Sequence, residues 1–167
     1  MRILGIDPGL KATGYGIIDF EKGHIETLKL IEAGTIEPKR SDLLQNKIKK
    51  VYQNLDSLIV QFQPDVMILE KLYSHHKYLT TASILGHVRG VICLLSAHRN
   101  LKLIEESVKR IRKAIVGQGN ASKNQTQSVV EHILKLDGNK LSEDASDALA
   151  LALGYVYILR NPLKKEI

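Results

Sequence analysis

The first 19 residues, MRILGIDPGLKATGYGIID, decide the fold. Residues 2–7 form an apolar run typical of a buried strand, yet the run ends in a charged residue, Asp7. Residues 12–20 form a second run, rich in Gly, Tyr and Ile, and residues 25–34 form a third. The connections between these runs are short and carry turn residues, so they predict an antiparallel meander of three strands.

The middle of the chain alternates between helical and strand patterns. Apolar residues at spacings of three and four predict a helix over residues 44–62, with Ser41 as its N-cap. The next buried strand, DVMILE at residues 65–70, again ends in a carboxylate. A helix over residues 78–99 then leads to another strand. A strand–helix–strand order predicts that this half of the sheet is parallel.

The last third of the chain is predicted to be helical. A short basic helix covers residues 107–115, and Ser122 starts another helix through a Ser-x-x-Gln capping box. A final helix begins near Ser142. We expect one domain over residues 1–160, followed by a flexible tail at residues 161–167.

The composition indicates a globular protein without a membrane partner. The chain has 167 residues, of which 44% are hydrophobic and 25% charged. No apolar run approaches the ~20 residues of a membrane span, and the N-terminal residues do not resemble a signal peptide. The single cysteine, Cys93, excludes an internal disulfide, and its apolar neighbours predict a buried thiol. These features predict a cytoplasmic location.

Two glycines, Gly86 and Gly90, lie one turn apart in the helix predicted over residues 78–99. Glycine inside a helix costs about 1 kcal/mol relative to alanine, so close backbone packing is a fair reason for both. The packing partner is either the sheet of the same chain or a second subunit.

The charge distribution favours a polyanionic partner, although weakly. The net charge is +6, and many soluble proteins are basic. Basic side chains gather at residues 109–113 and at Lys123, where the alternative interpretation is a solvated helix face. With two Phe and six Tyr, the chain is poorly suited to a broad base-stacking platform.

Four carboxylates carry the chemistry. Asp7 and Glu70 each end an apolar strand, and Asp144 and Asp147 lie three residues apart on one side of the last helix. Taken singly, each has an ordinary explanation: a turn, a strand end, or a helix N-terminus, where a carboxylate contributes ~0.3–1 kcal/mol. In α/β sheets, however, sites form beyond the strand ends, where all four could converge.

Carboxylates that converge repel one another unless a cation neutralises them. Oxygen ligands without clustered cysteine suit Mg²⁺, with Mn²⁺ as the alternative. Such a cluster fits two ions ~3.5–4 Å apart that flank a phosphodiester. The motif GIDPG alone also fits the phosphate-binding turn of sugar kinases and actin-like ATPases, but those folds repeat the unit in two domains, and 167 residues are too few.

In combination, five motifs resemble the RuvC family of Holliday junction resolvases: GIDPGLKATGYGII, VMILEKLY, LGHVRGVI, AIVGQGNASKNQ and DASDALALAL, in the family's order. The resemblance implies an α/β, RNase H-like fold with a five-stranded mixed sheet flanked by helices. It implies a homodimer that resolves four-way DNA junctions by symmetric, metal-dependent phosphodiester hydrolysis in recombination and repair. Branch-migration proteins of the RuvA and RuvB type are possible partners.

The resemblance also implies roles for single residues. The catalytic acids and metal ligands are Asp7, Glu70, Asp144 and Asp147, and some family members have histidine at the position of Asp144. Tyr73 occupies the position of an aromatic residue that wedges into the junction centre, with loop anchoring as the alternative. The residues expected to contact DNA are Tyr73, Lys109, Arg110, Arg112, Lys113 and Lys123.

His75 and His76 follow Tyr73 and lie near Glu70 in the sequence. They are candidates for DNA contact or proton transfer, although paired loop histidines are commonly plain surface residues. Without a cysteine partner, they do not indicate a zinc site.

Two rival functions stay open at this point. The first is a non-catalytic module that only recognises branched DNA, which gives no reason for four acids in one place. The second is a related RNase H-like enzyme that acts on RNA, or a smaller RuvC-like nuclease with another substrate. Cleavage of a junction, a nicked duplex and an RNA–DNA hybrid would separate them.

Overall fold

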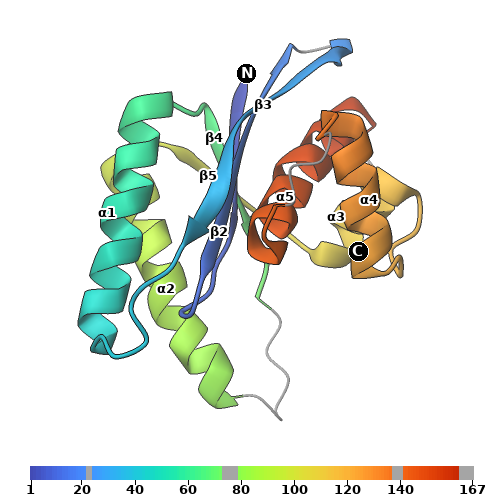
Figure 1. The fold of residues 1–167 in the computed structure, drawn as a ribbon. Coiled ribbons are helices and arrows are strands. Elements are labelled where there is room, and N and C mark those ends of the chain that lie inside the picture. The colour runs from blue at the N-terminus through green and yellow to red at the C-terminus, as the bar shows by residue number, and fades with distance from the viewer. Residues whose placement is uncertain (22–23, 73–78, 137–140, 162–167) are drawn as a thin grey trace.

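The computed structural model describes most of the chain, and the residues covered are 1–21, 24–72, 79–136 and 141–161. Five strands form one sheet in the order β3-β2-β1-β4-β5 (Figure 1). Their bounds are β1 (Arg2–Asp7), β2 (Thr13–Glu21), β3 (His24–Ile36), β4 (Val66–Glu70) and β5 (Lys102–Glu106). Strands β1, β2 and β3 are antiparallel neighbours, and β4 and β5 run parallel to β1. The predicted meander and the predicted parallel half are both confirmed.

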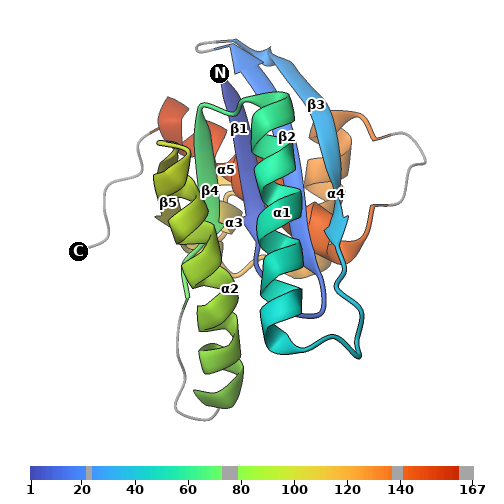
Figure 2. The same ribbon diagram turned by 90° about the vertical axis from the view of Figure 1, so that its left-hand side faces the viewer.

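The helices form a layer on each face of the sheet. Their bounds are α1 (Leu44–Phe62), α2 (Leu79–His98), α3 (Val108–Val116), α4 (Lys123–Leu134) and α5 (Glu143–Arg160). Helices α1 and α2 cover one face (Figure 2), and α5 lies on the other with α3 and α4 outside it (Figure 1). No helix in the described part of the chain is both long and apolar enough to span a membrane.

Alternation along the central strands produces two separate cores. In β1, Ile3 packs on the α5 side, whereas Leu4 and Ile6 pack on the side of α1 and α2. In β4, Ile68 joins the first core and Met67 the second. Because successive side chains of a strand point to opposite faces, a continuous apolar run fits a strand covered on both faces.

Helix α5 is more deeply buried than a single apolar stripe predicts. Leu151, Leu153 and Tyr155 are all buried, and only near the end of the helix is a large apolar side chain, Leu159, 40% exposed. The helix packs against the sheet on one side and against α3 and α4 on another. A helix covered from several sides is apolar almost all round, so a stripe describes it poorly.

Two local predictions were wrong. The N-cap position of α1 is Leu43, which makes no side-chain cap bond. Ser41 does not cap the helix, because the chain first makes a turn in which Asp42 Oδ2 accepts a hydrogen bond from Lys39 N at 3.1 Å. Cys93 is exposed, because it lies on a face of α2 that the sheet does not cover. The capping box at Ser122 is confirmed.

Gly86 and Gly90 both lie on α2. A Cβ atom at either glycine would meet nothing within 4 Å, so neither packs on the sheet of its own chain. Packing of these glycines on the sheet, one of the two alternatives from the sequence, is therefore not observed.

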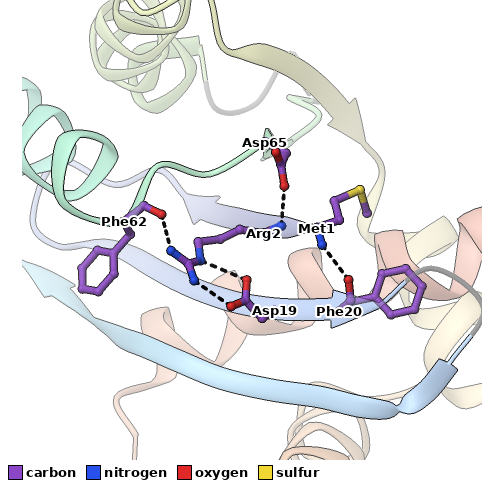
Figure 3. A network of polar contacts seen from close by, with 6 residues as sticks. All are labelled: Met1, Arg2, Asp19, Phe20, Phe62 and Asp65. Atoms are coloured by element: carbon purple, nitrogen blue, oxygen red, sulfur yellow. Dashed lines mark hydrogen bonds and ion pairs between the residues drawn. The ribbon is translucent and has the colours of Figure 1, made fainter.

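A polar network fixes the sheet at the N-terminal end of β1 (Figure 3). The guanidinium of Arg2 donates to both carboxylate oxygens of Asp19 at 2.9 and 2.7 Å and to the carbonyl oxygen of Phe62 at 2.5 Å. The main-chain nitrogen of Arg2 donates to Asp65 Oδ2 at 2.6 Å. These bonds link β1 to β2, to the end of α1 and to the start of β4.

Candidate active site

Asp7 and Glu70 lie side by side at the opposite end of the sheet from this network. Strands β1 and β4 are parallel neighbours, and their register pairs Ile6 with Leu69. The next residue on each strand is a carboxylate, so Asp7 and Glu70 leave the sheet at the same edge. Both are half-buried, and a hydrogen bond joins their side chains.

Helix α5 brings the two aspartates to this edge through an unusually close approach to the sheet. A Cβ atom on Gly14 would lie 1.9 Å from the carbonyl oxygen of Asp144, so no larger residue fits there. The register pairs Gly14 with Asp7 on the adjacent strand. The first turns of α5, with Asp144 and Asp147, are therefore held against the end of β1. Ser142 caps the helix by accepting from Ala145 N at 3.2 Å.

The four carboxylates lie near enough to one another to influence one another's ionisation. The pKa of Asp7 is raised to about 7, first by burial and then by the negative charges of Glu70, Asp147 and Asp144, in that order of size. Burial also raises the pKa of Asp144, and the nearby charge of Asp147 adds to the increase. The four acids predicted from the sequence are thus brought together from three elements.

The pKa of Glu70 is raised as well, first by burial. Its hydrogen bond with Asp7 opposes this increase, as do the positive charges of Arg89 and Arg112. One proton between Asp7 and Glu70 satisfies both carboxyl groups at a pH where their repulsion is otherwise unfavourable.

Among the described residues, no group of three His, Cys, Asp or Glu side chains is arranged so that it could bind a metal ion without rearrangement. Instead, Asp7 shares its hydrogen bond with Glu70, and Lys123 Nζ contacts Asp147 Oδ2 at 2.8 Å. The ammonium group of Lys123 thus offsets part of the negative charge, and burial favours the protonated form of Asp7. The donors are nevertheless oxygens only, half-buried and mutually repulsive, which fits a hard divalent cation. Binding would require Asp7 and Glu70 to be ionised and Asp147 to turn from Lys123.

A cleft of about 260 Å³ joins the acids to two basic residues. Glu70 and Asp147 line one part of it, and Arg112 of α3 and Lys123 of α4 line another. The remaining lining is mostly apolar and consists of Val108, Ile111, Thr126, Ala150 and Leu151. A phosphate group that approached the carboxylates here would meet the guanidinium of Arg112 and the ammonium of Lys123.

The other predicted DNA contacts are arranged differently. Arg110 turns away from the cleft and donates to Glu106 Oε1 and Oε2 at 2.7 and 3.0 Å. Lys109 and Lys113 are exposed, and the stem of Lys109 packs against Gly119. Tyr73, His75 and His76 lie outside the described residues. Of the five basic residues predicted, only Arg112 and Lys123 line the cleft with the acids.

One residue near the acids was missed by the sequence analysis. Arg89 of α2 donates to the carbonyl oxygen of Glu70 and pairs with the carboxylate of Glu105. The sequence does contain a signal for this residue. Arg89 is the one charged residue in the otherwise apolar run VRGVICLL at residues 88–95. A charge in the buried part of a helix calls for a specific partner.

Comparison with known proteins identifies the family of the chain. The family model for crossover junction endodeoxyribonuclease RuvC matches residues 3–155. The chain belongs to the RuvC family. A RuvC relative from Rhodopirellula baltica is 37% identical over 165 residues, which cover 99% of this chain and 91% of the relative. A RuvC relative from Caldicellulosiruptor saccharolyticus is also 37% identical, over 99% of this chain and 98% of its own length.

The fold is also that of the family. The structure of Thermus thermophilus RuvC in complex with a Holliday junction substrate superposes with a TM-score of 0.88. The two chains are 21% identical, and the match covers 96% of this chain and 95% of the other. The RuvC fold is RNase H-like, so the predicted fold class is confirmed.

Proposed function

We propose that this chain resolves four-way DNA junctions by metal-dependent hydrolysis of phosphodiester bonds. The observation that carries the proposal is the convergence of Asp7, Glu70, Asp144 and Asp147 at one edge of the sheet in a chain of the RuvC family. The family resemblance assigns these four residues the role of catalytic acids. A module that merely bound branched DNA would gain nothing from a group of anions beside its binding cleft.

The four acids are assigned the binding of divalent cations, Mg²⁺ or Mn²⁺, with two ions per site. When bound, such ions supply an activated water and stabilise the leaving oxygen. Asp7 and Glu70 hold their positions through β1 and β4, and Asp144 and Asp147 through the capped start of α5. Since rigid elements carry all four, the ligands are preorganised except for side-chain rotation.

Arg112 and Lys123 are assigned contact with the phosphate next to the cleavage point. They line the same cleft as Glu70 and Asp147. Their positive charges offset the repulsion that the acids would exert on DNA. Lys109 and Lys113 are assigned outer phosphate contacts, Arg110 a weaker role because Glu106 holds it, and Tyr73 the junction wedge. Such contacts recognise shape and charge more than sequence.

A homodimer with α2 in its interface is the assembly that we propose. The uncovered face of α2 carries apolar side chains, since Leu94 is 51% and Ile84 37% exposed. The open space at Gly86 and Gly90 on the same helix would admit a second helix closely. Two-fold symmetry would present two sites to two strands, as symmetric cutting requires. Partners of the RuvA and RuvB type and a cytoplasmic location remain predictions.

Cleavage of three labelled substrates tests the function. A four-way junction, a nicked duplex and an RNA–DNA hybrid are incubated with the protein in Mg²⁺ and, as a control, in excess chelator. We expect paired nicks on opposite strands of the junction in Mg²⁺ alone, and the nicks should be sealed by ligase. Binding of the junction without any cleavage would favour the recognition module, and preferred cleavage of the hybrid would favour an RNA-directed enzyme.

A further inference from the structure

Glu70 occupies the last position of β4, where the pairing with one of the two neighbouring strands has ended. The pairing with β1 ends one residue earlier, at Leu69. On the other side, β5 still holds the chain, because Lys71 N donates to Glu106 O at 2.8 Å. The main chain of Glu70 therefore needs a further contact on the α2 side of the sheet if its carboxylate is to keep one direction.

Arg89 supplies this contact from α2. One arm of its guanidinium donates to the carbonyl oxygen of Glu70, and another pairs with the carboxylate of Glu105 on β5. A guanidinium is a rigid planar fork, so two simultaneous bonds fix both its position and its orientation. The fork thereby ties the end of β4 to β5 through a third element.

The part of α2 that carries Arg89 is packed firmly against the sheet. Its neighbour Val88 and, one turn further on, Ile92 and Leu95 are fully buried against the sheet. The side chain of Arg89 is only 11% exposed, whereas Arg99, just beyond α2, is 40% exposed in its ion pair with Asp56. A charge buried this far is unfavourable unless its partners are held in place, so the contact to Glu70 is specific rather than one of many surface pairs.

We propose that Arg89 is a positioning residue for Glu70, which holds the main chain at the end of β4 so that the Glu70 carboxylate stays directed at the cation site. The inference rests on the proposed function, because it gives Arg89 its purpose through the cation that Glu70 would bind. Residues that orient metal ligands in this way commonly change metal affinity or activity by about 10–100-fold when replaced.

Binding of Mn²⁺ to the DNA-free protein, measured by calorimetry, tests the inference beside junction cleavage. For Arg89→Gln we expect Mn²⁺ binding to weaken by about 10–100-fold and cleavage to recover in part at high Mn²⁺. Junction binding in chelator should stay unchanged. Arg99→Gln is the matched control, since it removes the Arg99–Asp56 ion pair at 2.6 Å, far along α2 from the acids, and we expect it to leave Mn²⁺ binding unaltered.

Arg89→Lys keeps the charge and is expected to preserve the fold if Arg89→Gln does not. Because a single ammonium lacks the rigid fork, it should give an intermediate Mn²⁺ affinity. Suppose that the wild type cuts junctions, but Arg89→Lys or Arg89→Gln binds Mn²⁺ as tightly as the wild type does. This result would overturn the inference about Arg89 and leave the proposed function intact. A wild type that neither binds Mn²⁺ nor cuts would overturn the proposed function, and the role of Arg89 with it.

Discussion

The two ends of the central sheet treat their carboxylates in opposite ways. At one end, Arg2 donates two hydrogen bonds to Asp19 and lowers the pKa of that carboxyl group. At the other end, burial and the neighbouring acids raise the pKa of Asp7 to about 7. One strand takes part at both ends, since β1 begins at Arg2 and ends at Asp7. Their two ends differ in whether each charge has a fixed partner.

This contrast separates a contribution to stability from a contribution to function. The Arg2–Asp19 end stabilises the fold because each charge is matched by an opposite one. The Asp7–Glu70 end destabilises the cation-free fold, since like charges are held together by β1, β4 and α5. Natural proteins tolerate such unfavourable clusters where a ligand later uses them. Each variant considered next alters only one of these two ends of the sheet.

The largest effect is expected from Asp7→Asn, which removes a proposed metal ligand while keeping the shape of the side chain. Loss of about 4 kcal/mol of transition-state stabilisation corresponds to about a 10³-fold fall in the rate of junction cleavage. Binding of the junction in chelator should be retained, because the lost charge repels DNA. Single-turnover cleavage and an electrophoretic binding assay measure the two quantities.

Asp19→Asn makes the same chemical change at the other end of the sheet and serves as the control. It should weaken the pair with Arg2 and leave the cleavage rate near that of the wild type. Normal cleavage by Asp7→Asn in Mg²⁺ would show that Asp7 is not a metal ligand of the active site. A comparable loss in both variants would mean that the assay reports damage to the fold instead.

The second effect is a pH dependence of stability in the cation-free protein. A folded pKa near 7 for Asp7, against an ordinary value near 4, means that the folded state binds more protons than the unfolded state between these pH values. Stability should therefore fall as pH rises from about 4 to about 7. The full difference is about 4 kcal/mol, which partial access of water reduces to about 2 kcal/mol.

Urea unfolding in chelator at pH 5.5 and pH 8 measures about half of this change, because the decrease begins near pH 4. Asp7→Asn should flatten the difference, so that the variant is more stable than the wild type at pH 8. Mg²⁺ should stabilise the wild type at pH 8 by about 1.4 kcal/mol at ten times its dissociation constant, and the variant less. An identical pH profile for both proteins would place the unfavourable charge elsewhere.

Much of the fold could be predicted because its signals are local or periodic. The apolar runs that end at Asp7 and Glu70 marked two central strands, and short connections marked the meander. The four acids could be chosen because a carboxylate at the end of a buried strand is unusual, and because Asp144 and Asp147 have helical spacing. The family resemblance then agreed on the same four residues.

What the sequence could not supply depends on packing between distant segments. Nothing local indicates that Arg110 turns to Glu106 while Arg112, two residues on, enters the cleft. Arg89 was missed because its partner Glu70 is 19 residues away and offers only a main-chain carbonyl. The exposure of Cys93 was misjudged because an apolar helix face was assumed to pack on its own sheet. Each of these errors concerns the partner of a side chain or the helix face that packs on the sheet.

The smallest effect is expected from Arg2→Gln, which breaks the paired end of the sheet. The variant loses the bonds to Asp19 and Phe62, and we expect a loss of about 1–2 kcal/mol of unfolding free energy at pH 7. Because Arg2 lowers the pKa of Asp19, the stabilisation is complete above the ordinary value near 4 and is lost as the pH falls through the lowered value. The gap between variant and wild type should therefore narrow in acid, which urea unfolding at pH 7 and pH 3 would measure. Cleavage should be unchanged, and a variant that unfolded normally but cut poorly would show that the two ends of β1 are not independent.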